Sequence, residues 1–169
     1  MIPEFLMSNY ISPEKLNKKY NIKQFDCGNE QLNVYLKKYA LQNQKKNISN
    51  TFVAQNGDKV IGYYTLTFGS VLKEDLPEKT GKNLPSYPVP VMILARLAVD
   101  KTERGNDLGR GLLKNAVLRT LQASEIAGLK AIMVKAKDEE AKAFYEKFDF
   151  QVSPIDDLTL YLPIEFLKN

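Results

Sequence analysis

The segment Val91–Asp100 is almost continuously apolar and is broken only by Arg96. This pattern is typical of a central strand covered on both faces, because strands with one wet face alternate apolar and polar residues. Glycines and charged residues follow at Glu103–Gly111, and Leu112–Ala127 then has helical periodicity that ends at Gly128. A buried strand that leads through a glycine-rich turn into a helix predicts a layered fold of sheet and helices.

Other segments extend this layered pattern on both sides. Leu32, Tyr35, Leu36 and Tyr39 fall at i, i+3, i+4 and i+7 and predict one buried helix face. The predicted elements are helices at Glu30–Gln44 and Asp138–Phe148, the latter capped by Asp138, and strands at Asn50–Gln55, Lys59–Leu72, Ala131–Lys135 and Leu158–Leu162.

Glycines and prolines predict the connections between these elements. Asn56-Gly57 predicts a two-residue hairpin, and Gly62 and Gly69 predict bulges or a bend in the long return strand. Lys73–Pro90 contains Pro77, Pro85, Pro88 and Pro90 and predicts a long loop. The element order predicts an α+β domain, a mixed sheet with helices on both faces.

Length and composition suit one globular domain over residues 1–169, with 44% hydrophobic residues. No apolar run approaches the roughly 20 residues that a membrane helix needs. Met1–Leu6 is too short for a secretory signal and is set apart as an extension before a natural start at Met7. Cys27 is the only cysteine, which excludes an internal disulfide and suits a reducing cytoplasm.

Histidine is absent from the sequence. This absence excludes hydrolases with the usual Ser-His-Asp or Cys-His chemistry and most zinc sites. Any general acid or base must therefore be Asp, Glu, Lys, Tyr, Cys or water.

The net charge of +4 is unevenly distributed. Residues 14–46 contain eight bases and three acids, residues 101–137 the same numbers, and residues 138–169 three bases and eight acids. The two basic segments are compatible with a polyanionic partner or with a solvated lysine-rich surface.

The turn between the central strand and its helix has the features of an anion site. Glycine allows a ligand to approach the backbone, and the first N–H groups of a helix have no partner within it. Arg104 and Arg110 flank the turn and could add charge-assisted hydrogen bonds to a pyrophosphate. A glycine-containing helix start without a ligand is the alternative.

Several ordered motifs resemble the GNAT acetyltransferases. Arg96-Leu97-Ala98-Val99-Asp100 followed by Arg104 to Leu113 resembles their acetyl-CoA signature, Gln/Arg-x-x-Gly-x-Gly/Ala, and Ala143 to Phe148 resembles their Phe-Tyr helix. Further matches are Phe25-Asp26-Cys27-Gly28 with Leu32 and Leu36, Thr51-Phe52-Val53, Gly62-Tyr63-Tyr64 and Ser153-Pro154-Ile155-Asp156. The whole set, from Phe25 to Pro163, is similar to toxins of type II toxin–antitoxin modules that acetylate aminoacyl-tRNA.

The resemblance implies a GNAT (acyl-CoA N-acyltransferase) fold with a mostly antiparallel sheet, acetyl-CoA as cosubstrate and no metal. The residues that it assigns to acetyl-CoA are Leu97, Ala98, Val99, Arg104, Gly105, Asn106, Asp107, Leu108, Gly109, Arg110, Gly111 and Phe144.

Two aspartates depart from the family pattern. The loop from Arg104 to Gly111 is the expected phosphate loop. Asp107 stands in it where the family usually has glycine, and Asp149 replaces the glycine of a Phe-Gly-Phe. A carboxylate beside a pyrophosphate is repelled by roughly 1 kcal/mol or more. Asp adopts a left-handed backbone more easily than most residues. We therefore expect acetyl-CoA binding to survive in weakened form.

The resemblance makes Tyr145 the general acid that protonates the departing thiolate. A phenol with a pKa of about 10 stays protonated at neutral pH, so the role is chemically reasonable. Helix spacing alone favours a core position for Tyr145, on a stripe with Ala141, Phe144 and Phe148, and the family resemblance reverses that preference. Backbone N–H groups at Leu97–Val99 are expected to polarise the thioester carbonyl.

No residue stands out as a general base, which favours an acceptor that is already partly neutral. An α-amine has a pKa of roughly 7.7–8.0, against about 10.4 for a lysine side chain. This favours the amino acid of a charged tRNA, and phosphate contacts would make its binding fall steeply with salt. The candidate tRNA contacts are Lys37, Lys38, Lys45, Lys46, Arg96 and Arg119.

The leading hypothesis is therefore a cytoplasmic toxin that acetylates aminoacyl-tRNA and blocks translation. The resemblance also implies a homodimer, a ribbon-helix-helix antitoxin as partner, and no membrane association. Two alternatives stay open: an acetyltransferase for a small amine or a protein N-terminus, and an acyl-CoA-binding module without turnover.

Overall fold

The computed structural model describes residues 12–168, so Met1–Leu6 lies outside the described residues. These residues fall into two compact units. One comprises residues 12–67 and 95–117, and the other comprises residues 68–94 and 118–168. The single domain expected from the sequence stays a prediction.

The strands form a mixed, mostly antiparallel sheet, which confirms the predicted fold class. Pairs β1–β2, β2–β3, β5–β7 and β6–β7 are antiparallel, whereas β4–β5 is parallel. The order is β1-β2-β3-β4-β5-β7-β6, with β1 at Glu14–Lys15, β2 at Asn50–Asn56, β3 at Lys59–Val71, β4 at Val89–Val99, β5 at Ala131–Lys135, β6 at Gln151–Val152 and β7 at Thr159–Pro163.

The three helices that the sequence predicts are present, together with several short helices that it does not predict. The α-helices are α1 (Glu30–Val34), α2 (Ala40–Lys45), α3 (Glu78–Gly81), α4 (Leu108–Ser124) and α5 (Glu139–Glu146). The π-helix η2 spans Tyr35–Tyr39, and 3-10 turns lie at η3 (Lys73–Asp75), η4 (Lys101–Glu103) and η5 (Ile164–Phe166). Among residues 12–168, no helix is long and apolar enough to cross a membrane.

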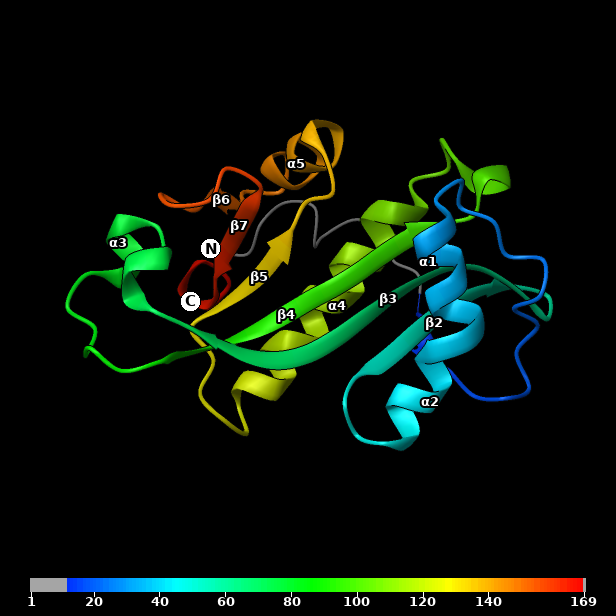
Figure 1. Cartoon of the computed structure of the whole chain (residues 1–169), viewed down its shortest axis with the longest axis horizontal. Helices are drawn as coiled ribbons and strands as arrows, with labels where there is room; N and C mark the ends of the chain where they lie inside the picture. Colours follow the sequence, from blue (N-terminus) through cyan, green and yellow to red (C-terminus); the bar gives the residue numbers. More distant parts are fainter. Residues whose placement is uncertain (1–11, 169) are drawn as a thin grey trace. The chain divides into compact units, whose positions relative to one another are not determined.

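In the unit of residues 12–67 and 95–117, β3 separates two helical layers. Tyr63 is fully buried and donates a hydrogen bond to the Leu32 carbonyl of α1 at 2.7 Å. The next residue, Tyr64, faces the opposite side and reaches Asn115 of α4. Neighbouring strand residues point to opposite faces, so helices cover β3 on both sides, as Figure 1 shows for α1 and α4.

The helix α1–η2–α2 packs on β2 and β3 through one apolar cluster. Tyr35, Leu36 and Ala40 are buried there, as the sequence predicts for the first two. Tyr39 was predicted on the same face, and this prediction is wrong, because its side chain is 50% exposed. The π-turn inserts one extra residue, which rotates the following residues and places Ala40 inward in place of Tyr39.

The hairpin between β2 and β3 lies one residue later than predicted. Asn56 pairs with Lys59, so Gly57 and Asp58 form the turn, and Gly57 has a φ of 65°. The register shifts between Ala54, which pairs with Gly62, and Gln55, which pairs with Val60. The extra residue of β3 confirms the predicted bulge at Gly62.

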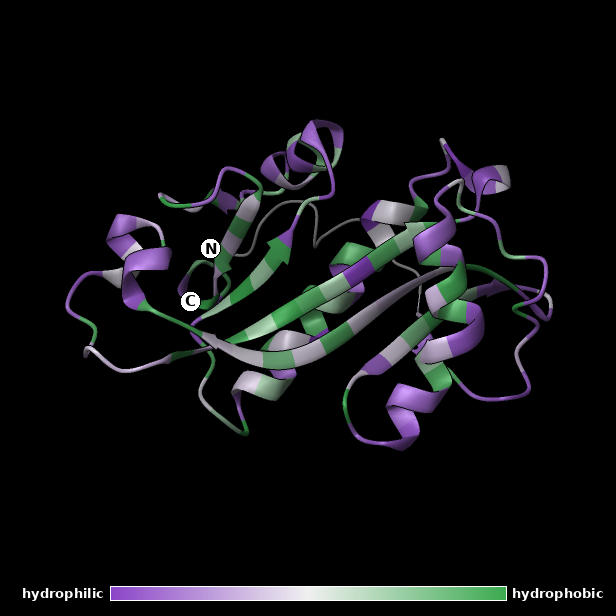
Figure 2. Cartoon of the chain, in the orientation of Figure 1, coloured by the Kyte–Doolittle hydropathy of each residue, from purple (hydrophilic) through white to green (hydrophobic). Residues whose placement is uncertain are grey.

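In the unit of residues 68–94 and 118–168, β5 lies between β4 and β7, and its register runs from Val91–Ala131 to Leu94–Val134. The core there includes Leu76, Val91 and Tyr161. Lys73–Pro90, predicted as a loop, contains η3 and α3, and β4 begins at Val89. In Figure 2 hydrophobic residues are prominent on β4 and β5, whereas the ribbons of α2, α3 and α5 are mostly hydrophilic.

Candidate functional site

The predicted acetyl-CoA residues Leu97–Gly111 lie together in one unit, at the end of β4 and the start of α4. Ala98 is buried and its neighbours Leu97 and Val99 are half-buried. The parallel ladder with β5 ends at Leu94, whereas β4 continues to Val99. The exposed segment Arg104–Asp107 follows, and α4 begins at Leu108, four residues earlier than predicted.

The first turn of α4 supplies the amide groups of an anion site. Its first helical hydrogen bond runs from the Gly111 N–H to the Asp107 carbonyl at 3.1 Å. The N–H groups of residues 108–110 therefore have no acceptor within the helix. Such unpaired amides and the helix dipole favour a bound anion.

Gly62 of β3 allows this turn to lie close to the strand. A Cβ atom at this position would lie 3.0 Å from Leu112 Cδ1, 3.1 Å from Leu108 Cδ2 and 3.3 Å from the Ala98 carbonyl oxygen. These distances are tighter than ordinary van der Waals contacts. Its place within a strand predicted a bulge or a bend, and the sequence pattern does not reveal this packing role.

Arg110 contributes the strongest sign of an absent ligand in this turn. Its Nε atom is buried and has no hydrogen-bond partner among the described residues. A buried donor without a partner costs about 1–3 kcal/mol, so native proteins rarely keep one without a reason. An anion on the first turn of α4 would satisfy this donor.

Asp107 adopts the left-handed backbone that the sequence analysis anticipated. Its φ is 60°, and its side chain is exposed. Asp149, which follows α5, has a φ of 69°. Both aspartates therefore have the left-handed backbone that glycine favours, at a conformational cost of about 1 kcal/mol each.

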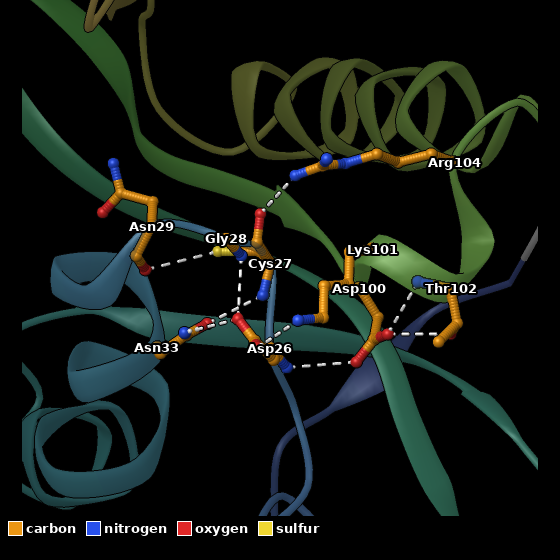
Figure 3. A network of polar contacts seen from close by, with 9 residues as sticks. All are labelled: Asp26, Cys27, Gly28, Asn29, Asn33, Asp100, Lys101, Thr102 and Arg104. Carbon is orange, nitrogen blue, oxygen red and sulfur yellow. Dashed lines mark hydrogen bonds and ion pairs between the residues drawn. The ribbon is translucent and has the colours of Figure 1, made fainter.

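A polar network around Asp26 joins the turn 26–28 to the segment 100–104 (Figure 3). One Asp26 carboxylate oxygen accepts from the Gly28 N–H at 2.9 Å and from the Asn33 side chain at 3.0 Å. The other carboxylate oxygen pairs with Lys101 Nζ at 3.0 Å. These contacts, led by the Gly28 N–H, lower the pKa of the Asp26 carboxyl well below its usual range.

Asp100 forms the second half of the same network. Its carboxylate accepts from the Asp26 N–H at 3.1 Å and from the N–H and hydroxyl of Thr102 at 3.0 and 2.7 Å. Burial raises the pKa of the Asp100 carboxyl, but the hydrogen bonds from Thr102 and Asp26 outweigh it, so the net pKa is lowered. Both carboxylates are therefore ionised at neutral pH.

Arg104 reaches this network from the phosphate loop. Its Nη2 donates to the Cys27 carbonyl at 2.8 Å, a contact between residues 77 apart in sequence. In the sequence, Phe25-Asp26-Cys27-Gly28 belongs to the family resemblance but has no predicted role. The Asp-x-Gly pattern of Asp26 and Gly28 could have indicated a tight turn, because Asp and Gly are both common in turns.

Phe144 and Tyr145 lie in the other unit, on α5. Asp138 caps this helix by accepting from the Ala141 N–H at 2.8 Å, as predicted. Tyr145 is 7% exposed and packs edge-on against Phe144 with a ring separation of 5.2 Å. Burial raises the pKa of the Tyr145 hydroxyl, which keeps its proton in place at neutral pH.

The six candidate tRNA contacts differ in exposure. Lys37, Lys38, Lys45 and Lys46 are exposed on the α1–η2–α2 helix. The guanidinium of half-buried Arg96 lies 3.6 Å from the centre of the Tyr35 ring, a cation–π contact within the same unit. Arg119 is half-buried and belongs to the other unit. Within residues 12–168, no group of three or more Cys, Asp or Glu side chains could hold a metal ion.

Comparison with known proteins gives consistent results. The model of the acetyltransferase (GNAT) domain family matches residues 47–152. A protein of Mycobacterium tuberculosis named tRNA-acetylating toxin is 43% identical over 156 residues, which are 92% of this chain and 93% of that protein.

Two solved structures with similar folds contain ligands. AtaT complexed with acetyl-methionyl-tRNAfMet has a TM-score of 0.86 and 27% identity, over 94% of this chain and 99% of that chain. AtaTR bound with AcCoA has a TM-score of 0.80 and 26% identity, over 95% of this chain and 98% of that chain.

Proposed function

Since this chain belongs to the GNAT acetyltransferase family, we propose that it transfers the acetyl group of acetyl-CoA to the α-amine of an aminoacyl-tRNA. The observation that carries this proposal is the 43% identity, over nearly the full length of both chains, to a tRNA-acetylating toxin. Acetylation would remove the free amine that peptide-bond formation requires, so the enzyme would act as a toxin that blocks translation.

The anion site at the start of α4 fits the pyrophosphate of acetyl-CoA. The helix supplies the unpaired N–H groups of residues 108–110, and the buried Arg110 Nε lacks a partner among the described residues. Both favour a bound anion. The extension of β4 beyond its ladder with β5 supports Leu97–Val99 as the segment whose N–H groups polarise the thioester carbonyl.

The reaction needs one attack and one proton transfer to the leaving group. The neutral amine attacks the thioester carbonyl carbon, a C–N bond forms, and the C–S bond breaks. Tyr145 is the proposed donor of the proton that the departing sulfur takes up. The amine releases a proton to water, and the Tyr145 phenolate regains a proton from water. Burial raises the pKa of the Tyr145 hydroxyl, so it is protonated at neutral pH, as a proton donor must be, but the same burial makes it a weaker acid than a free phenol.

The four exposed lysines of the α1–η2–α2 helix are the proposed contacts for tRNA phosphates. Arg96 and Arg119 remain candidates, with Arg96 already stacked on Tyr35. We place the enzyme in the cytoplasm, where charged tRNA is found. The sequence resemblance further supports a homodimer restrained by a ribbon-helix-helix antitoxin.

The proposal is tested by incubating the purified protein with labelled acetyl-CoA and total charged tRNA. We expect label in the tRNA fraction that mild alkali releases as an N-acetylated amino acid. Label found only on a polyamine or on protein N-termini would favour the alternative acceptors. Bound but untransferred acetyl-CoA would favour a module without turnover, and either result would contradict the proposal.

The rate should rise with pH and show no alkaline decline. The acceptor amine has a pKa of roughly 7.7–8.0, so the rate should rise about tenfold per pH unit below that range and then level off. Burial raises the pKa of Tyr145, so its proton is retained through at least pH 9. Initial rates between pH 6 and 9 check this, and a fall above pH 8 would contradict an acid with a raised pKa.

Replacing Asp107 should strengthen acetyl-CoA binding. Asp107→Gly removes the exposed carboxylate beside the phosphate site and relieves a left-handed residue. Loss of roughly 1 kcal/mol of repulsion corresponds to an affinity gain of about fivefold. Isothermal titration of acetyl-CoA measures it. Asp107→Asn separates the two effects, because it removes the charge and keeps a side chain. Asp149→Gly relieves a similar backbone and should leave the affinity unchanged.

A further inference from the structure

The turn Asp26–Gly28 lies against the residues that precede the phosphate loop. The Lys101 N–H donates to the Asp26 carbonyl at 2.9 Å, and its ammonium pairs with the Asp26 carboxylate at 3.0 Å. The Asp26 N–H in turn donates to Asp100 at 3.1 Å. The start of the segment 100–104 is thus fixed to the turn through both backbone and side chains.

Arg104, at the end of this segment, is held by the same turn. Its Nη2 donates to the Cys27 carbonyl at 2.8 Å (Figure 3). The guanidinium is planar and rigid, so one hydrogen bond to a fixed carbonyl restricts the orientation of its other N–H groups. One Nη2 N–H is used by the Cys27 carbonyl, and the remaining N–H donors of this exposed side chain could bind a phosphate.

The turn is itself rigid, which makes it a suitable anchor. Asn33 of α1 donates to the Asp26 carboxylate at 3.0 Å and accepts from the Cys27 N–H at 2.9 Å. Cys27 is buried, and Gly28 has a φ of 86°. The Cys27 carbonyl is therefore fixed from both sides by groups that have no other evident role in the reaction.

Gly28 provides the space that Arg104 occupies. A Cβ atom on Gly28 would lie 2.8 Å from Arg104 Nη2, closer than real Cβ atoms approach a neighbour. The nearest other atom is also in the guanidinium, Cζ at 3.9 Å. A side chain at position 28 would therefore displace the Arg104 guanidinium in particular.

We propose that the turn Asp26–Gly28 positions Arg104 for the phosphates of acetyl-CoA, with Cys27 supplying the carbonyl anchor and Gly28 the space. These are positioning residues, since none of them is placed in contact with the reacting atoms. The proposal rests on acetyl-CoA as the cosubstrate and assigns a role to a motif outside the phosphate loop.

Gly28→Ala and Gly57→Ala form a matched pair for the test. Both glycines belong to the same unit and have positive φ angles, 86° and 65°. A Cβ atom on Gly57 would meet nothing within 4 Å, so its replacement causes backbone strain without a clash. Calorimetric titration of acetyl-CoA and initial-rate kinetics are run on both variants, with thermal unfolding as a check on folding.

We expect Gly28→Ala to raise the Kd and KM for acetyl-CoA about tenfold, as loss of one charge-assisted contact would. The kcat at saturating acetyl-CoA and the KM for charged tRNA should stay within about twofold of wild type, and Gly57→Ala should match wild type in all of them. In an Arg104→Ala background, adding Gly28→Ala should have no further effect on the Kd, because both changes remove the same contact.

Wild-type affinity in Gly28→Ala, or effects of the two substitutions that multiply in the double variant, would overturn the proposal. If Gly28→Ala does not fold, Asp26→Asn tests the same anchor: it removes the charge paired with Lys101 and should weaken acetyl-CoA binding severalfold. Titration needs no acceptor, so absence of tRNA acetylation by wild type would refute the proposed function and leave this result readable.

Discussion

Tyr145→Phe should lower kcat about 100-fold while the Kd for acetyl-CoA changes by less than twofold. The substitution removes the hydroxyl of a buried side chain, and burial raises the pKa of that hydroxyl. General acid catalysis typically raises a reaction rate by at least about 100-fold. The ring packs against Phe144 and Phe150, and phenylalanine keeps those contacts. Single-turnover rates at saturating acetyl-CoA measure the loss.

Phe150→Leu serves as the control for this prediction, because Phe150 packs against Tyr145 and is not among the residues assigned to acetyl-CoA. It disturbs the neighbouring ring and removes no dissociable proton, so its kcat should fall far less than that of Tyr145→Phe. A kcat for Tyr145→Phe within threefold of wild type would show that the leaving thiolate departs without this acid. Such a result would also favour the alternative prediction for Tyr145, which is a structural residue in the core.

Leu36→Ala should lower the free energy of unfolding by about 3 kcal/mol. Leu36 is 1% exposed and lies in the cluster that joins η2 to β2 and β3, where a truncated leucine leaves a cavity. Urea denaturation followed by circular dichroism measures the change. Ile48→Ala is the matched control, because Ile48 is 57% exposed and its truncation should cost less than about 0.5 kcal/mol.

Leu36→Ala also tests whether the helix that carries Lys37 and Lys38 depends on the core beneath it. We expect the affinity for tRNA to fall as the folded fraction falls and to be normal in the fraction that remains folded. An unfolding midpoint equal to wild type would show that η2 packs loosely.

The sequence predicted regular elements better than irregular ones. The bounds of β5 match the predicted strand in full, because a short, mostly apolar run between turn signals is typical of a buried strand. The capped start of α5 was also predictable, because Asp138 precedes the apolar stripe. The exposed position of Tyr39 was not predictable. The prediction assumed 3.6 residues per turn throughout the helix, and no local residue type marks the π-helix at Tyr35–Tyr39.

The candidate site was predictable only where it is local in sequence. The phosphate loop and Asp107 belong to one continuous segment, so glycines and arginines predicted a candidate anion site there, and the family resemblance assigned it to acetyl-CoA. The Asp26 network joins segments more than 70 residues apart, and its partners are ordinary surface residue types. Arg110 was placed near phosphate, but the burial of its Nε depends on packing that spacing does not describe.

An exposed carboxylate at Asp107 that weakens acetyl-CoA binding, as we propose, would also change how the enzyme responds to the acetyl-CoA concentration. Weaker cosubstrate binding raises the KM, and an enzyme whose KM exceeds the prevailing cosubstrate concentration works on the linear part of its saturation curve. The rate of such an enzyme follows acetyl-CoA supply nearly in proportion. A glycine at this position would shift the enzyme toward saturation, so this one side chain would set how closely the rate follows the acetyl-CoA concentration.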